Sequence, residues 1–308
     1  QTNPLVDDVD GAVKDNTKAT RFFGSLYANW NITKDLLFRT TLGVDVRNKR
    51  RGYYCSANSL DGEGKDSKSL KEHTIESGIT WENVLTYSKI LGEHDFQIMG
   101  GTSTIYKSKE YTLASGKGQT YGGNIYHNLA SNTKEVMIDS YLNEEKLASF
   151  FGRVNYKFMD RYILTASLRA DGSSLLADGH KWGYFPSVGL GWRLSQESFL
   201  KENKVITNLK IRGSFGITGN QEIGNYKSLA QLTGSNYTDG SSVIYGFKES
   251  IGNGDLKWER TTQFDLGFDL SLWNRIDIAF DYYTRNTNDL LYNVPIPSTS
   301  GYSSILSN

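Results

Sequence analysis

Residues 261–272 (TTQFDLGFDLSL) alternate between apolar and polar side chains without interruption. Successive side chains of an extended strand point to opposite faces, so this segment has one apolar face and one wet, partly acidic face. Similar runs recur about ten times along the chain, in pairs joined by tight polar turns. The connections between pairs are long and rich in Gly, Asn and Tyr. Short turns at one end and long connections at the other are typical of an outer-membrane β-barrel.

The alternation predicts five hairpins, whose strands pair in chain order. They join 21–32 to 36–47, 74–90 to 96–109, 149–158 to 162–171, 184–194 to 209–216, and 261–273 to 276–285. Long connections are predicted at 48–71, 110–146 and 217–257, and in a barrel all of them lie at the outer end. The link within the fourth pair (SQESFLKEN) is expected to hold one helical turn. Pro186 predicts a strand start or a bulge there, because proline cannot donate to a ladder.

The composition favours a single sheet with one apolar face over a globular fold with a large hydrophobic core. Apolar residues make up 38% of the chain, below the roughly 45–50% of ordinary globular domains. Aromatic residues reach 13%. A wall that is apolar outside and wet inside needs only half of each strand to be apolar. We therefore predict an all-β, antiparallel up-and-down transmembrane β-barrel with short periplasmic turns and long extracellular loops, to which this chain contributes about ten strands.

Several other classes of protein lack support in the sequence. No stretch approaches the roughly 18 consecutive apolar residues of a membrane-spanning helix, which excludes a helical membrane protein. The net charge is zero, which gives no support for nucleic-acid binding. Cys55 is the only cysteine and the four histidines are scattered without ligand spacing, so neither a metal nor a cofactor is expected. No nucleophile has a base or an elbow motif beside it, so we do not expect an enzyme.

Aromatic and charged residues fit the two environments of such a wall. Trp30, Trp192 and Trp273 fall near strand ends on the apolar side, where an aromatic belt would meet the membrane boundary, although ordinary sheet packing would also place them there. The charged positions alternate with the apolar ones and are therefore expected to face water, mostly as a solvated wall. They include Arg39, Arg47, Arg153, Arg169, Asp171, Arg212, Asp265, Asp269 and Asp281.

Four stretches contain specific motifs in addition to the alternation of apolar and polar residues. Residues 169–174 read RADGSS, 182–199 read WGYFPSVGLGWRLSQESF, 209–226 read LKIRGSFGITGNQEIGNY, and 256–291 read LKWERTTQFDLGFDLSLWNRIDIAFDYYTRNTNDLL. Together with Pro295 and Pro297 they resemble the SusC/RagA family of TonB-dependent outer-membrane transporters of Bacteroidetes. The matches follow the family's order and spacing from about residue 169 to residue 302. The first half of the chain matches the family only in its general strand pattern.

The resemblance implies a segment of a barrel of roughly 22 strands, located in the outer membrane. Residues 1–308 would all belong to the barrel domain, with the plug domain and the C-terminal strands outside this chain. It also implies partners: a SusD-like surface lipoprotein, and the TonB–ExbB–ExbD energy-transducing complex acting through parts not in this chain. Family members import oligosaccharides, or peptides in the RagA branch, and oligosaccharide is the expected cargo here, with no covalent chemistry and no cofactor.

Five residues are candidates for contact with cargo. Asn220, Gln221 and Asn225 follow a strand and could pair donors and acceptors with sugar hydroxyls, or could instead satisfy the backbone of a tight loop. Trp182 and Tyr184 follow the GSSLLADGHK loop. They could supply a flat surface for a sugar ring, or anchor the strand at the outer boundary of the membrane.

Two other hypotheses remain open from the residues alone. A soluble, surface-attached β protein that binds glycans without transport would also use aromatics and amides. It would bury Phe264, Leu266, Phe268 and Leu270 against a second sheet, whereas a transporter leaves them to lipid. A passive porin would differ from an importer in lacking a plug.

Overall fold

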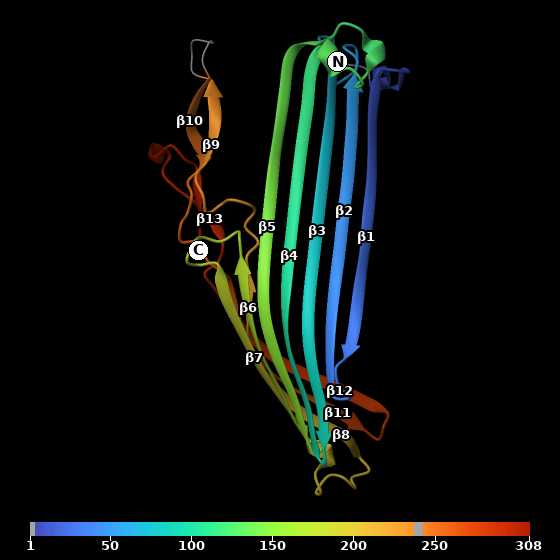
Figure 1. Ribbon diagram of the computed structural model, residues 1–308, viewed down its shortest axis with the longest axis vertical. Coiled ribbons are helices and arrows are strands. Elements are labelled where there is room, and N and C mark those ends of the chain that lie inside the picture. Colours follow the sequence, from blue (N-terminus) through green and yellow to red (C-terminus); the bar gives the residue numbers. More distant parts are fainter. Residues whose placement is uncertain (1–3, 237–242) are drawn as a thin grey trace. The chain divides into compact units, whose positions relative to one another are not determined.

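The computed structural model describes residues 4–236 and 243–308, and most of them lie in antiparallel strands. Figure 1 shows the main sheet, in which neighbours follow the chain order except where β11 succeeds β8. Its ten strands are β1 (Val13–Asn31), β2 (Leu36–Cys55), β3 (Lys68–Leu91), β4 (His94–Gln119), β5 (Asn132–Phe158), β6 (Tyr162–Ser173), β7 (Trp182–Arg193), β8 (Ile206–Asn220), β11 (Glu259–Leu272) and β12 (Ile276–Asn288).

Two small hairpins and five short 3-10 turns complete the described elements. The hairpins are β9 (Gln231–Asn236) with β10 (Val243–Ser250), and β13 (Tyr292–Pro295) with β14 (Ser304–Ser307). The turns are η1 (Pro4–Asp8), η2 (Gly122–Asn124), η3 (Leu129–Ser131), η4 (Leu194–Gln196) and η5 (Ser298–Ser300). In the described part of the chain, no helix has the length and apolar content needed to cross a membrane.

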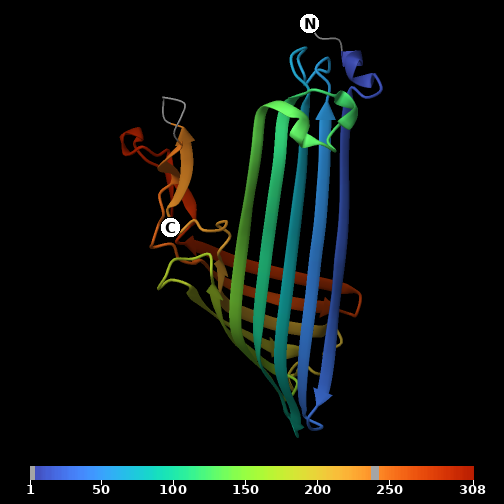
Figure 2. The same ribbon diagram turned by 45° about the horizontal axis from the view of Figure 1, so that its top comes forward.

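The chain divides into two compact units. The first contains residues 1–26, 42–80 and 106–144, and the second contains residues 27–41, 81–105 and 145–308. In the first unit, Figure 2 shows the green connection between β4 and β5 lying at the ends of its strands. This connection packs closely, because a Cβ added at Gly52 would lie 2.4 Å from the ring of Tyr126.

All five predicted hairpins are confirmed, and their turns are tight except in the fourth, where residues 194–205 join β7 to β8. Met159 and Asp160 have φ of 53° and 56° between β5 and β6, and Trp273 and Asn274 have φ of 53° and 55° between β11 and β12. Two successive residues with positive φ give a turn whose twist matches the right-handed twist of the strands it joins. The helical turn expected in the link after β7 is also confirmed, as η4.

The predicted long connections were too long. Strand β2 continues to Cys55 and β3 begins at Lys68, so the first connection is 56–67 rather than 48–71. Likewise β4 and β5 leave only 120–131 of the predicted 110–146. These strand ends carry polar residues on both faces, so no apolar alternation marks them. Backbone pairing and ion pairs such as Arg51 with Asp15, 2.9 Å apart, support them instead.

The third predicted connection, 217–257, also contains secondary structure. Strand β8 extends into it as far as Asn220, and β9 and β10 lie within it. Residues 237–242 of this connection fall outside the described residues. The sequence analysis also missed β13 and β14, which are four residues each and too short for their alternation to stand out.

Pro186 neither starts a strand nor marks a bulge, contrary to the prediction. It is the fifth residue of β7 and lies opposite Leu168 of β6 in a register without a shift. Pairing of β7 with β8, however, begins only at Ser187. Proline, which has no N–H group, is therefore tolerated, because β7 is not paired with β8 at this position.

The register of β8, β11 and β12 separates apolar from polar side chains. Leu266 lies opposite Tyr282 and Gly213, while Phe268 lies opposite Phe280 and Ile211. On the other face, Gly267 lies between Arg212 and Asp281. Because a slip of one residue would exchange the two faces, this register maintains one apolar and one charged surface.

The apolar surface of these strands is not covered by a second sheet in the described residues. Phe264, Leu266 and Phe280 are 44%, 48% and 55% exposed, and Phe268 and Leu270 are half-buried beside their strand neighbours. A water-soluble sandwich would bury such residues. This arrangement contradicts the sandwich hypothesis and agrees with a face that contacts lipid.

A small hydrophobic core lies in the second unit. Leu176, Phe185 and Trp258 are buried together, and the rings of Phe185 and Trp258 meet edge to face with centroids 5.2 Å apart. The Trp258 indole donates a hydrogen bond to the Lys181 carbonyl at 2.9 Å. A Cβ at Gly219 would lie 2.2 Å from the Phe185 ring, so glycine is needed for this close approach.

Aromatic rings line the turn end of the second unit. Ring centroids are 6.3 Å apart between Trp192 and Tyr162, 6.2 Å between Tyr162 and Phe158, and 4.8 Å between Phe158 and His94. Trp30, Trp192 and Trp273, the residues expected in a belt, are all exposed in the second unit. Amphipathic rings on an exposed apolar face at strand ends suit the boundary of a membrane.

Glu197 joins this aromatic group to the link after β7. Its carboxylate accepts hydrogen bonds from the Trp192 indole at 3.0 Å and the Tyr162 hydroxyl at 2.8 Å, and the Arg161 guanidinium lies 3.0 Å away. These donors, the Trp192 indole first, hold the pKa of Glu197 below its ordinary value of 4.5. The ionised form is thus favoured in the folded protein.

We expect Glu197 to stabilise the folded receptor at neutral pH and to lose that contribution in acid. A lowered folded pKa gives stability that is present above the unfolded pKa and disappears as the pH falls through the folded pKa. Thermal unfolding of the wild type and of Glu197→Gln should therefore differ at neutral pH and converge well below pH 4.5. A difference that stays constant across this range would contradict the assignment.

Candidate functional site

Trp182 and Tyr184 lie on the apolar face of β7. They are 47% and 57% exposed, and they share their face with Val188, Leu190 and Trp192. The Trp182 ring stacks on Phe150 with centroids 6.0 Å apart and covers Gly172, where a Cβ would lie 2.9 Å from the indole. The sequence had left these residues open as a sugar platform or as boundary anchors. Their position beside other exposed apolar side chains favours the second role.

Asn220, Gln221 and Asn225 lie at the end of β8 and just beyond it. The Asn220 side chain accepts a hydrogen bond from the Glu222 amide at 3.1 Å, which closes a local Asx turn. Asn225 is half-buried. The side-chain oxygen of Gln221 is buried and has no hydrogen-bond partner among the described residues. This oxygen is therefore an enclosed acceptor that the described residues leave unsatisfied.

Arg212 lies at the centre of the charged surface formed by β8, β11 and β12. Its guanidinium is 2.6 Å from Asp281, 3.3 Å from Asp269 and 3.8 Å from Asp265. A shallow pocket of about 190 Å³ opens beside it, lined also by Thr165, Lys210 and Ser214. Even with Lys210 opposite Asp269, the three carboxylates outnumber the two cations, so this part of the wall is acidic.

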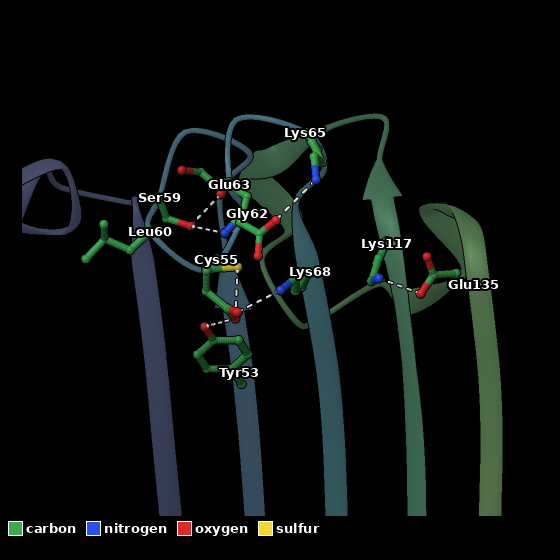
Figure 3. A network of polar contacts seen from close by, with 12 residues as sticks. Tyr53, Cys55, Ser59, Leu60, Gly62, Glu63, Lys65, Lys68, Lys117 and Glu135 are labelled. Carbon is green, nitrogen blue, oxygen red and sulfur yellow. Dashed lines mark hydrogen bonds and ion pairs between the residues drawn. The ribbon is translucent and has the colours of Figure 1, made fainter. Parts of the chain in front are cut away.

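A second polar group lies in the first unit, where β2 and β3 meet their connection (Figure 3). The Asp61 carboxylate accepts a hydrogen bond from the Tyr53 hydroxyl at 2.6 Å and from the Lys68 ammonium at 2.7 Å. These donors, Lys68 first, lower the pKa of Asp61. The Cys55 thiol is buried beside the same carboxylate, with sulfur and oxygen 3.6 Å apart.

A pocket of about 440 Å³ opens beside this group. Tyr53, Asp61 and Lys68 line it together with an ion pair between Lys117 and Glu135, 2.5 Å apart. Tyr53 lies on the same face of β2 as Arg51, which pairs with Asp15 and Glu72. The pocket thus belongs to the charged face, where its hydroxyl, ammonium and carboxylate groups can exchange hydrogen bonds with a polar ligand.

Neither polar group has the arrangement that covalent catalysis needs. Cys55 has no basic side chain within hydrogen-bond distance among the described residues, and its thiol donates instead to the Asp61 carboxylate. The described residues also contain no cluster of three or more His, Cys, Asp or Glu side chains that could hold a metal ion. The arrangement can bind and orient polar molecules through hydrogen bonds and charge.

The pocket beside Tyr53 and Asp61 was not predicted from the sequence. Residues 48–71 were expected to form a connection, which gives no facing direction for Tyr53 or Lys68. The signal that could have found it is the continued odd spacing of Arg47, Arg51, Tyr53 and Cys55 beyond the apolar part of β2. That spacing keeps these side chains on the charged face only if the strand continues.

Comparison with known proteins identifies the fold family. The family model described as "TonB dependent receptor-like, beta-barrel" matches residues 2–308. The TonB-dependent receptor P3 of Formosa agariphila is 35% identical over 314 residues, which cover 99% of this chain and 31% of that protein. The TonB-dependent receptor SusC of Bacteroides thetaiotaomicron is 35% identical over 225 residues, which cover 71% of this chain and 22% of that protein.

A solved structure agrees with these relatives. The structure of the RagAB peptide transporter superposes with a TM-score of 0.88 and 26% identity, covering 96% of this chain and 33% of that one. The resemblance to SusC and RagA and the predicted barrel fold are therefore confirmed. The expected location is confirmed as well, since these proteins reside in the outer membrane of Bacteroidetes.

The chain spans about a third of the length of the curated relatives it matches. The family model covers nearly all of its residues. The relatives are named as receptors. The chain belongs to the TonB-dependent receptor β-barrel family.

Proposed function

We propose that this chain is part of the barrel wall of a TonB-dependent importer of the SusC type, which takes up nutrient oligosaccharides. In this proposal the whole protein supplies a plug domain and the remaining strands, and works with a SusD-like lipoprotein and the TonB–ExbB–ExbD complex. The observation that carries it is the match of 96% of this chain to the RagAB transporter at a TM-score of 0.88, together with 35% identity to SusC.

The charged face supports a route for hydrated cargo. Arg212 with its three aspartates, and the pocket beside Tyr53 and Asp61, present charges and hydroxyl groups away from the apolar face. Hydrogen-bond donors and acceptors on this face can form and release hydrogen bonds with sugar hydroxyls as cargo moves past. Multiple weak contacts suit transport, because a tight site would retain the cargo.

Within this function we assign the sequence candidates different roles. Asn220, Gln221 and Asn225 contact cargo, because their amide side chains can pair donors and acceptors with sugar hydroxyls. Trp182 and Tyr184 anchor β7 at the membrane boundary, since both lie on the exposed apolar face. Their earlier alternative as a sugar platform would require them to face the other side of β7.

Peptide cargo is the second candidate. The specific observation in its favour is that the superposed RagAB structure is described as a peptide transporter. Carboxylates such as Asp265 and Asp269 beside Arg212 would also bind the charged groups of a peptide. The two cargoes differ in whether charge or hydroxyl hydrogen bonding dominates recognition.

Uptake by cells with and without the full-length gene tests the proposal. We expect its deletion to abolish uptake of a labelled oligosaccharide, and deletion of TonB to have the same effect. Loss of peptide uptake alone would select the second candidate. Uptake that continues without TonB would contradict active import of either cargo.

The role of Gln221 gives a sharper test. We expect Gln221→Ala to slow oligosaccharide uptake about fivefold, because the loss of one hydrogen bond of about 1 kcal/mol weakens the contact. The control is Asn203→Ala, which removes a side chain that caps Val205 and Ile206 at 2.8 and 3.0 Å. Equal uptake by the two variants, at equal abundance in the membrane, would count against a cargo role for Gln221.

A further inference from the structure

A pocket of about 480 Å³ lies on the face of the first unit opposite the ion pairs described above. It is lined by side chains from β1, β2, β3, β4 and the connection 120–131. Tyr126 of that connection lies over Gly52, and the rings of Tyr126 and His127 are 4.7 Å apart. Its lining includes Lys18, Arg50, Lys71, His73, Tyr126 and His127. Arg51 and Glu72, which form an ion pair with each other at 3.8 Å, also border it.

Alternation along β2 shows which face carries this pocket. Leu42, Val44 and Val46 have the same parity as Arg50, so Arg50 lies on the apolar face of β2. Arg51 has the opposite parity and pairs with Asp15 on the charged face. The two neighbouring arginines of β2 therefore point to opposite sides of the sheet.

The neighbouring strands agree with this placement. His73 of β3 contacts the Asn48 side chain of β2 at 3.1 Å, and Asn48 has the parity of Val46. Ile75 and Ile79 share the parity of His73 on β3, and Phe22 shares that of Lys18 on β1. On β1, β2 and β3, the apolar side chains thus give way to a cation or an imidazole toward the end of the strand that borders the pocket.

Three cations of the pocket, Lys18, Arg50 and Lys71, differ from Arg51 and from the other cations of the charged face in having no carboxylate partner among the described residues. On the charged face, Arg21 is 2.7 Å from Asp45, Arg51 is 2.9 Å from Asp15, and Lys68 is 2.7 Å from Asp61. Among the described residues, Lys18, Arg50 and Lys71 make no ion pair, and all three are exposed. An anionic ligand could therefore pair with these three positive charges.

We infer that this pocket binds the phosphate-bearing headgroup of an outer-leaflet lipid whose acyl chains lie along the apolar face below it. Lys and Arg beside an apolar surface attract anionic headgroups, and a guanidinium can hold two phosphate oxygens at once. Tyr126 provides the amphipathic ring that favours the boundary between headgroups and acyl chains. The headgroup occupies the pocket because its charge complements the unpaired cations and its chains have an apolar face to follow.

Lipid binding by the full-length receptor in neutral detergent tests this inference. The probe is fluorescent phosphatidic acid, which carries a phosphate monoester, compared with the same lipid lacking phosphate. We expect the double variant Arg50→Gln/Lys71→Gln to bind phosphatidic acid about thirtyfold more weakly, because each cation near a headgroup contributes about a factor of five. The matched control is Lys49→Gln/Lys65→Gln, with Lys49 on the other face of β2, and its affinity should stay within about twofold of wild type.

Two further measurements distinguish lipid binding in the pocket from nonspecific attraction to positive charge. Gly52→Leu should displace Tyr126, because even a Cβ at Gly52 lies 2.4 Å from its ring, and should weaken binding with no change in charge. Inorganic phosphate at millimolar concentration should not displace the lipid. Equal weakening by both double variants, no weakening by Arg50→Gln/Lys71→Gln, or displacement by inorganic phosphate would each overturn the inference.

Discussion

Leu266→Arg should destabilise the full-length receptor by about 2–4 kcal/mol, the cost of an arginine at the midplane of the lipid face of a barrel. Leu266 lies in the middle of β11, is 48% exposed and sits opposite Tyr282 on the apolar face. A guanidinium at this point would have to leave water for hydrocarbon. The measurement is denaturant unfolding of the receptor folded into lipid vesicles.

Ser214→Arg is the matched control. Ser214 lies on the charged face, opposite Asp265 of β11. Asp265 directly precedes Leu266, so the two substitutions lie at nearly the same height on opposite faces. The new guanidinium would meet a carboxylate and water, so we expect a change within about 0.5 kcal/mol. If Ser214→Arg proved as destabilising as Leu266→Arg, the two faces would not differ in environment and the account of the wall would be wrong.

Trp258→Ala should destabilise the receptor by about 3–5 kcal/mol, the usual cost of removing a buried Trp or Phe side chain. Trp258 is 6% exposed, packs edge to face on Phe185 and donates a hydrogen bond to the Lys181 carbonyl. Its loss would leave a cavity beside Leu176 and an unsatisfied carbonyl. Denaturant unfolding of the full-length receptor again measures the effect.

Trp182→Ala provides the comparison for Trp258→Ala. Both changes remove an indole, but Trp182 is 47% exposed on the apolar face of β7. We expect a loss of about 1 kcal/mol or less, because the lost contacts are partly with lipid. Similar losses for the two variants would show that the cluster of Leu176, Phe185 and Trp258 is not a stabilising core.

The hairpins could be predicted from the sequence because the apolar face imposes a period of two. In β11 and β12, Phe264 to Leu272 and Ile276 to Phe280 make that period plain. The period ends where both faces meet water. Arg50 and Arg51 are adjacent cations on opposite faces, and no apolar alternation shows that β2 continues through them.

The candidate site was less predictable than the fold. Asn220 and Gln221 have similar amide side chains, yet Asn220 bonds the Glu222 amide while the Gln221 oxygen is unsatisfied among the described residues. Spacing alone cannot separate these outcomes, because they depend on which backbone groups are near. The pocket beside Tyr53 and Asp61 likewise requires β2, β3, β4 and β5 to be aligned, and only the register of the strands sets that alignment.

Site-directed spin labelling along β11 tests most directly which face of the wall touches lipid. Single cysteines would replace residues 263–270 in turn in the full-length receptor carrying Cys55→Ser, reconstituted in bilayers. The account predicts a period of two: labels at Phe264, Leu266, Phe268 and Leu270 are reached by dissolved oxygen, and labels at Gln263, Asp265, Gly267 and Asp269 by a water-soluble nickel complex. Labels at the even positions that neither reagent reaches, or accessibility without a period of two, would contradict it.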